Sequence, residues 1–284
     1  LYELHINGQK IGDHRLDPMY TRFDRRNLYV TYDVTQQLQD GANAVGILLG
    51  NGWYNHQSGA VWNFERAPWR NRPAFCLDLH IEYADGTREV VKSDLDWRTS
   101  GGPLVFNSIY TSEHYDARLE QPGWSAPGFD DSAWEGVMYR SAPSQNVTAQ
   151  QTVPIRNVTQ YRPRSVRKLD GKSYLYDFGQ NMAGVTELKI KGEAGTELRL
   201  VHAERLREDG HADLSNIDVY FRPTDDSDLF QTDVVILSGR DDEFMPRFNY
   251  KGFRYVEVVA DRPVELTAEN KRQFFVPRGF AHGF

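Results

Sequence analysis

The sequence predicts an all-β protein built from two tandem antiparallel β-sandwich domains. Short segments that alternate apolar and polar residues recur along the chain, and dipeptides typical of tight turns, such as Asn7-Gly8 and Asp85-Gly86, interrupt them. The 284 residues include 15 Tyr, 15 Phe, 23 Gly and 13 Pro, a composition that favours strands and turns. Long amphipathic helical patterns are hard to find. The length leaves room for two domains, each with its own core.

The first sandwich is predicted over residues 1–142. Its expected strands are residues 28–33, 44–49, 75–83 and 87–91, together with a hairpin over residues 2–12. Residues 57–72 carry several aromatic side chains without a regular period, which indicates a long ordered loop at one end of the sheet, and long loops of this kind are often functional.

The second sandwich is predicted over residues 155–262. Residues 143–154 are polar, begin and end with proline and lack periodicity, so we interpret them as a linker. The expected strands are residues 173–178, 185–190, 197–203, 229–237, 245–250 and 253–259, with a glycine-bounded break at 179–184. Residues 263–284 form a separate tail.

Charge and cysteine content exclude several classes of protein. The formal net charge of -7 and the scattered Lys and Arg residues argue against a nucleic-acid surface. No apolar run approaches the roughly 20 residues that a membrane-spanning helix needs. The one cysteine, Cys76, excludes an intrachain disulfide, and its apolar neighbours predict that it lies in the core.

Two stretches carry side chains suited to binding a sugar. In the first, Asn51 lies between two glycines and is followed by Trp53 and Tyr54. An amide beside an indole face suits a carbohydrate, although a tight turn whose Trp covers the core would have the same pattern. The second stretch places Asn107, Glu113 and Asp116 among tyrosines. The alternative there is a plain strand with its carboxylates solvated or paired with Arg118.

Taken together, many phrases in one order resemble the N-terminal region of bacterial α-L-rhamnosidases of glycoside hydrolase family 78, over roughly residues 1–260. The phrases are Ile6-Asn-Gly8, Tyr32-Asp-Val-Thr35, Leu49-Gly-Asn-Gly-Trp-Tyr54, Ile109-Tyr110 with Glu113, Tyr115-Asp-Ala-Arg118, Gly123-Trp124, Tyr176-Asp-Phe-Gly-Gln-Asn181, Ala183-Gly184, His202-Ala-Glu204, Pro246 and Tyr250-Lys-Gly-Phe-Arg-Tyr255.

The resemblance implies a jelly-roll or galactose-binding-like domain followed by a concanavalin-like domain. In such enzymes these domains precede an α/α-barrel whose acidic pair cleaves terminal α-L-rhamnosides with inversion, which requires a general acid and a general base with room for water between them. No stretch here resembles that barrel motif. We therefore expect no catalytic residue in this chain, no activity of the chain alone, and a barrel domain as its missing partner. The compartment stays open between periplasm, cell surface and cytoplasm.

The first domain is similar to a rhamnose-binding module. The resemblance assigns binding of rhamnose-containing glycans to Asn51, Trp53, Tyr54, Asn107, Glu113 and Asp116. It requires no cofactor, and it allows a calcium ion. Family members often carry an acidic residue where this chain has Asn51, and calcium prefers several oxygen ligands that include carboxylates.

The tail resembles a different family. Residues 264–284, and Val276–Phe284 above all, are similar to the core strand and turn of dTDP-4-dehydrorhamnose 3,5-epimerase, in which His282 would be a substrate-pocket residue. Acid–base catalysis needs further groups placed on the sugar, and those segments lie outside the matched piece. We expect an inactive, unpaired β-segment that arose by gene fusion, a truncated frame or an assembly artefact.

The leading hypothesis is thus a noncatalytic, carbohydrate-binding region of an α-L-rhamnosidase. One alternative is an epimerase, which rests on the tail alone. The other is a structural scaffold for an absent α/α-barrel.

Overall fold

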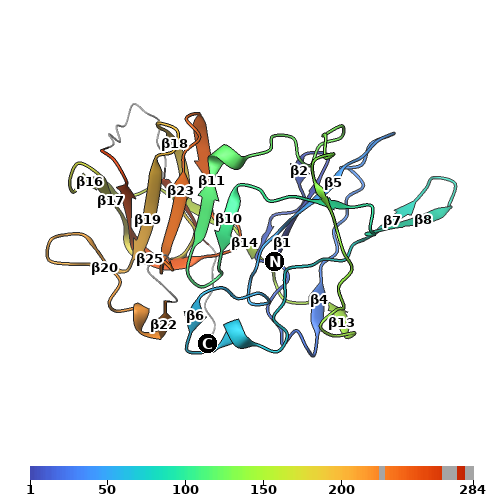
Figure 1. Ribbon diagram of the computed structural model, residues 1–284, viewed down its shortest axis with the longest axis horizontal. Coiled ribbons are helices and arrows are strands. Elements are labelled where there is room, and N and C mark those ends of the chain that lie inside the picture. Colours follow the sequence, from blue (N-terminus) through green and yellow to red (C-terminus); the bar gives the residue numbers. More distant parts are fainter. Residues whose placement is uncertain (224–227, 264–273, 279–284) are drawn as a thin grey trace.

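The computed structural model describes residues 1–223 and 228–263, and the backbone of residues 274–278 (Figure 1). The predicted all-β class is confirmed, because strands and three one-turn 3-10 helices make up the regular structure of these residues. In this described part of the chain, no helix is long and apolar enough to cross a membrane.

The elements up to residue 142 are short. The strands are β1 (Tyr2–Ile6), β2 (Gln9–Lys10), β3 (His14–Arg15), β4 (Asn27–Tyr29), β5 (Val45–Leu49), β6 (Gly59–Ala60), β7 (Asp78–Glu82), β8 (Arg88–Lys92), β9 (Arg98–Thr99), β10 (Leu104–Asn107), β11 (Glu113–Asp116) and β12 (Glu135–Gly136), and the 3-10 helices are η1 (Phe64–Arg66) and η2 (Ala117–Leu119).

The later elements include longer strands. They are β13 (Val147–Ala149), β14 (Ile155–Arg156), β15 (Thr159–Tyr161), β16 (Ser165–Lys168), β17 (Ser173–Gly184), β18 (Glu187–Lys191), β19 (Glu197–Ala203), β20 (Arg205–Leu206), β21 (Ala212–Asp213), η3 (Asp218–Tyr220), β22 (Phe221–Arg222), β23 (Thr232–Ile236), β24 (Asp241–Phe244), β25 (Lys251–Ala260) and β26 (Phe274–Arg278).

Two predicted hairpins are confirmed, and each depends on its turn residues. Strands β1 and β2 pair across Asn7 and Gly8, whose φ angles of 51° and 82° are the positive values that a two-residue hairpin turn requires. Strands β7 and β8 pair in the same way across a turn in which Gly86 has a φ of 84°. In both turns glycine occupies a left-handed conformation without steric cost.

A seven-stranded sheet joins the two halves of the chain. Its order is β10-β11-β23-β19-β25-β17-β16, so its first two strands precede the predicted linker and the others follow it. Strand β11 pairs with β23 in parallel, with His114 opposite Val234. Figure 1 shows β10 and β11 in the middle of the molecule, beside β23. The segment predicted as a linker also pairs with one earlier strand, since β13 runs parallel to β4.

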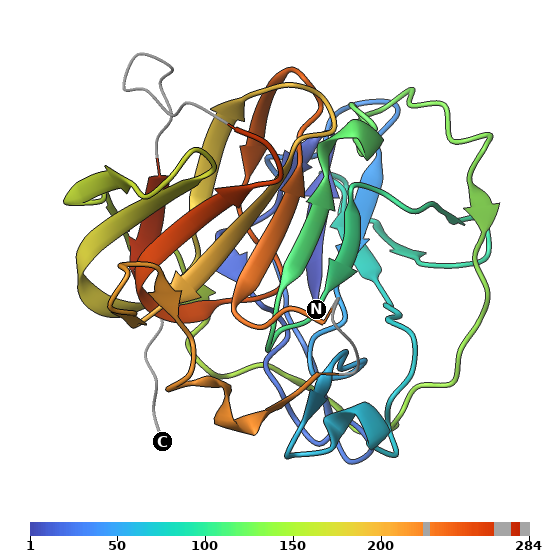
Figure 2. The same ribbon diagram turned by 60° about the vertical axis from the view of Figure 1, so that its left-hand side comes forward.

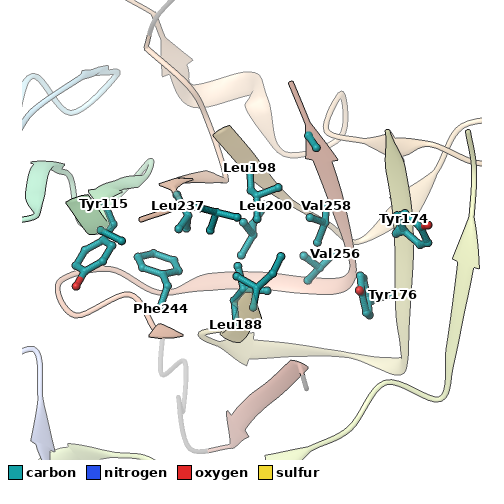
Figure 3. Close-up of a cluster of buried hydrophobic side chains, with 14 of the residues drawn as sticks. Tyr115, Tyr174, Tyr176, Leu188, Leu198, Leu200, Leu237, Phe244, Val256 and Val258 are labelled. Atoms are coloured by element: carbon teal, nitrogen blue, oxygen red, sulfur yellow. The ribbon is translucent and has the colours of Figure 1, made fainter. Parts of the chain in front are cut away.

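A second sheet, of order β15-β26-β18-β24, completes the hydrophobic core of the later domain. Its Leu188 and Phe244 lie among aliphatic residues of β19 and β25, and Tyr115 of β11 reaches the same cluster (Figure 3). The tail expected to be unpaired is part of this sheet, because the backbone of β26 pairs with β15 and with β18. That expectation was wrong for residues 274–278.

Strand β17 continues through the predicted glycine break. It pairs with β25 before and after this break. Asp177 lies opposite Tyr255 and Met182 lies opposite Phe253, so β17 has more residues than β25 between these two pairs, and its extra residues form a bulge. Gly179 has a φ of 78°, and its N–H donates to the Asp177 carboxylate over 2.6 Å. Gly179 therefore bends a long strand here without ending it.

Cys76 lies at the surface, so the prediction of a core position was wrong. It precedes the β7–β8 hairpin, which projects from the molecule as a two-stranded sheet (Figure 1). A two-stranded sheet has no second layer to cover its apolar face. Alternating apolar residues can therefore stay exposed there, which the pattern alone does not show.

Candidate functional site

Asn51 and Asn107 bind each other. The backbone N–H of Asn51 donates to Oδ1 of Asn107 over 2.7 Å, and Nδ2 of Asn51 donates to the Asn107 carbonyl over 2.8 Å. Oδ1 of Asn51 in turn accepts from Nδ2 of Asn55. These bonds connect the turn after β5 to the end of β10. The structure therefore brings the two predicted stretches together at this point.

Trp53 and Tyr54 line a small apolar pocket of about 160 Å³, which we call the apolar pocket. The Trp53 ring stacks on the ring of His56, with 5.2 Å between centroids and an interplanar angle of 24°. Tyr54 meets Phe23 edge-on at 5.3 Å, and burial raises the pKa of its hydroxyl. The other lining residues are Leu1, Leu16, Pro18, Met19, Tyr20, Phe23, Gly52, Ile109, Ile155 and Tyr250.

On the other side of this ring pair lies a larger cavity of about 550 Å³, which we call the polar cavity. Its lining comes from the loop after Asn55, from β10 and β11, and from one residue beyond β22. The lining residues are His56, Gln57, Ser58, Gly59, Glu65, Arg66, Arg70, Phe106, His114 and Asp228. The volume falls in the usual range for ligand pockets.

Three buried polar atoms of the polar cavity lack a hydrogen-bond partner. They are both ring nitrogens of His56 and Oε2 of Glu65. Native proteins rarely leave such atoms unpaired, because each one costs about 1–3 kcal/mol when it is desolvated without a partner. All three atoms are closed to solvent, so they lie behind the surface of the cavity.

Burial keeps His56 neutral. Burial lowers the pKa of His56 to about 4, with a further decrease from Arg70, while Glu65 and Asp228 act in the opposite direction. A neutral imidazole offers one donor and one acceptor. Nε of Arg70 donates to the His56 carbonyl over 3.1 Å, which orients the guanidinium. Ser58 donates to Asp228 over 2.7 Å.

The Glu113 carboxylate binds backbone N–H groups of the later domain. It is completely buried and accepts hydrogen bonds from the backbone N–H groups of Arg247 and Phe248, at 2.9–3.0 Å. Burial raises the pKa of Glu113 to about 7. Its backbone N–H donates to Asp233 of β23 over 2.8 Å. Glu113 therefore fixes β11 against the later domain and does not line either cavity.

Asp116 is paired with Arg118, which was one of the alternatives for this stretch. The two side chains form bonds of 2.7 and 2.9 Å, and the hydrogen bond from Arg118 holds the pKa of Asp116 below its ordinary value. Asp116 also caps η2 through the backbone N–H of Arg118. The sugar-binding role of both carboxylates stays a prediction.

The oxygen-bearing side chains assigned to sugar binding already have partners within the protein. The side-chain oxygens of Asn51, Asn107, Glu113 and Asp116 already accept hydrogen bonds within the protein. Throughout residues 1–223 and 228–263, no three His, Cys, Asp or Glu side chains are grouped so that they could hold a metal ion. His282, the residue singled out by the epimerase resemblance, lies outside the described residues.

The polar cavity was not predicted as a site from the sequence. Its residues come from segments as far apart as His56 and Asp228, and no spacing in the sequence connects these two. The available signal was the long loop over residues 57–72, which was expected to be ordered and functional. That loop supplies Glu65, Arg66 and Arg70.

We expect the protein to lose stability in mild acid because of its buried histidines. Burial lowers the pKa of His56 and of His202 to about 4, so the unfolded chain binds protons below pH 6.5 that the folded chain does not bind. Glu113 acts in the opposite direction, because its raised pKa makes the folded state bind a proton that the unfolded state releases. The two histidines together outweigh Glu113, so the free energy of unfolding should fall by about 1 kcal/mol from pH 6 to pH 5.

Urea denaturation at both pH values measures this effect. His56→Phe should make the free energy of unfolding less dependent on pH over this interval, because one of the groups that takes up a proton only on unfolding is then absent. His80→Phe, at an exposed position of β7, should keep the wild-type dependence. An unchanged pH dependence in His56→Phe would contradict the assignment of a buried neutral His56.

Comparison with known proteins gives a consistent result. Residues 1–159 match the α-L-rhamnosidase N-terminal domain, and residues 167–276 match the bacterial α-L-rhamnosidase concanavalin-like domain. An α-L-rhamnosidase of Streptomyces avermitilis is 40% identical over 263 residues, which cover 91% of this chain and 24% of that protein. The chain spans about a quarter of the length of the curated relatives it matches.

Solved structures agree with these matches. The structure of Streptomyces avermitilis α-L-rhamnosidase complexed with L-rhamnose superposes with a TM-score of 0.86 and 35% identity, over 98% of this chain and 26% of that one. The α-L-rhamnosidase from Dictyoglumus thermophilum gives a TM-score of 0.83 and 36% identity, over 98% of this chain and 29% of the other.

Proposed function

Because this chain belongs to the family of bacterial α-L-rhamnosidases, whose N-terminal and concanavalin-like domains it contains, we propose that it is a noncatalytic, carbohydrate-binding region of an enzyme that acts on terminal α-L-rhamnosides. The chain corresponds to about a quarter of its relatives, which leaves ample length for a separate catalytic domain. An α/α-barrel that carries the acidic pair is the partner that the family resemblance implies.

The observation that carries the binding proposal is the polar cavity itself, whose volume lies in the usual range for ligand pockets and whose lining includes Gln57, Arg66 and Arg70. A sugar hydroxyl both donates and accepts, so it can pair with the amide of Gln57 and with the guanidinium groups of Arg66 and Arg70. Rhamnose is a 6-deoxyhexose, and its methyl group suits an apolar surface. A relative of this chain was solved in complex with L-rhamnose, which supports the same class of ligand here.

The six residues predicted from the sequence take different roles in this proposal. Trp53 stacks on His56 of the polar cavity, and Tyr54 lines the adjoining apolar pocket together with Trp53. Asn51 and Asn107 hold the turn and the strand end in place through their mutual hydrogen bonds. Glu113 and Asp116 act as positioning residues, because they fix the strand β11 that carries His114 into the polar cavity.

Titration with L-rhamnose tests the binding proposal. We expect a saturable chemical-shift or calorimetric response at millimolar sugar, and Trp53→Ala should weaken the affinity at least tenfold, since it removes the ring stacked on His56. Trp97→Ala is the matched control, because Trp97 packs against Phe75 beside the projecting hairpin, away from the cavity. The response should be the same with and without calcium.

If the folded protein gives no response to millimolar rhamnose, the binding proposal fails, and the remaining interpretation is a structural scaffold for the α/α-barrel.

A separate assay addresses catalysis. The chain should release no product from an aryl α-L-rhamnoside, and measurable hydrolysis would overturn the noncatalytic assignment.

We infer no epimerase activity. Residues 274–276 of the epimerase-like tail also belong to the matched concanavalin-like domain, and β26 pairs within the sheet of that domain. An assay with the dTDP-4-dehydro sugar should stay at background.

A further inference from the structure

A small antiparallel pair, β6 with β22, joins the two halves of the chain next to the polar cavity. Ala60 lies opposite Phe221, and the N–H of Val61 donates to the Tyr220 carbonyl over 3.2 Å. Figure 2 shows these two segments together at the lower end of the molecule. The residues that flank the pair present large apolar side chains to solvent. Trp62 is 46% exposed and Tyr220 is 55% exposed, and we call these two rings the aromatic platform.

Other aromatic rings pack against the aromatic platform and hold it in place. The centroids of Trp62 and Tyr220 are 6.0 Å apart, with an interplanar angle of 33°. Trp62 also meets Tyr110 edge-on at 5.1 Å, and Tyr110 packs on Phe230 at 5.3 Å. Phe230 is buried and stacks on Phe221. Fixed rings of this kind offer contact area at a low cost in conformational entropy.

The platform begins at the rim of the polar cavity. Ser58 and Gly59 line the cavity, and Trp62 follows Gly59 by three residues. Trp53 touches the rings of both His56 and Trp62, so it connects the cavity wall to the platform. The platform therefore belongs to the same cluster of packed rings as His56 of the polar cavity.

The size and chemistry of this surface favour a sugar over a protein. The exposed apolar patch consists of the two rings with Val61 and Val219, whereas a stable protein interface needs about 800 Å² on each partner. The guanidinium of Arg222 donates to the carbonyls of Val219 and Phe221, so its hydrogen bonds are directed to the backbone. What remains is a pair of aromatic faces suited to the C–H surface of a pyranose ring.

We propose that the aromatic platform is a second sugar subsite, which binds the neutral sugar next to the rhamnose in the polar cavity. This inference rests on the proposed function, since the first sugar must occupy the cavity. It makes the ligand an extended rhamnose-containing oligosaccharide.

Calorimetric titration with L-rhamnose and with a neutral trisaccharide that ends in rhamnose tests this subsite. The trisaccharide should bind at least tenfold more tightly than the monosaccharide. Trp62→Ala should abolish that difference and leave the affinity for the monosaccharide unchanged. Trp62→Phe should retain most of the difference. Tyr139→Ala is the control for loss of an exposed ring, because Tyr139 is 74% exposed and lies outside both cavities and the platform.

The failures of the two proposals can be told apart. If wild-type protein binds neither sugar, the proposed function itself fails. If it binds both sugars equally, or if Trp62→Ala keeps the tenfold difference, the second subsite is overturned while rhamnose binding stands. Loss of monosaccharide binding in a Trp62→Ala protein that still melts cooperatively would place Trp62 in the first subsite, and it would also overturn the inference.

Discussion

Replacing Lys251 by Met should lower the free energy of unfolding by about 3–5 kcal/mol, which is the usual cost of removing one partner of a buried ion pair. Lys251 and Asp233 are both buried, and their charged atoms lie 2.6 Å apart. Oδ1 of Asp233 also accepts from the N–H of Glu113 and from Nδ2 of Asn249. Without Lys251, a carboxylate that holds β11 against β23 loses its counter-charge.

Chemical denaturation measures this effect, and two variants make the result specific. Lys92→Met changes an exposed strand position of β8 and should shift the free energy of unfolding by less than about 0.5 kcal/mol. Asp233→Leu combined with Lys251→Met should recover part of the loss, because no unpaired charge stays buried. A Lys251→Met protein as stable as the Lys92→Met control would show that the pair does not hold the two halves together.

Replacing Gly50 by Ala should destabilise the protein by about 2–3 kcal/mol through overpacking. A Cβ at Gly50 would lie 2.2 Å from Cγ of Phe248 and within 2.6 Å of both Cδ atoms. Phe248 is completely buried, and its backbone N–H is bound by Glu113. The ring therefore has little freedom to move away from the added methyl group.

Thermal or urea unfolding of Gly50→Ala tests this contact. Gly136→Ala is the matched control, since a Cβ there meets no atom within 4 Å, and it should be neutral or slightly stabilising. Equal stability of the two variants would mean that the turn after β5 does not pack on Phe248 as described.

Local features of the fold were predictable, and long-range ones were not. Turn chemistry around Asn7 and Gly86 identified two hairpins, because the sequence of a few adjacent residues decides their geometry. The parallel pairing of β11 with β23 depends on residues more than 110 positions apart, and alternation within each strand does not reveal it. Likewise, Gly179 marks a bend in the backbone, but whether a strand ends or bulges there is decided by its partner β25.

The candidate site shows the same division. The family resemblance assigned Asn51 and Asn107 to one sugar-binding site, and the structure joins them by hydrogen bonds, although the sequence around either residue does not indicate the other. The polar cavity was not predicted, since it forms where Asp228 meets the loop after Asn55. His56 looked isolated in the sequence, and its unpaired nitrogens are visible only once its burial is known.

The position of β10 and β11 in the seven-stranded sheet has a consequence for folding during synthesis. These two strands leave the ribosome more than 100 residues before β23 and β25, on which the sheet is built. Until β23 emerges, β11 has an open hydrogen-bonding edge, and the carboxylate of Glu113 lacks the Arg247 and Phe248 amides that bind it. The two domains therefore reach their final form together, and a polypeptide divided at residue 142 would separate edge strands from the sheet that they complete.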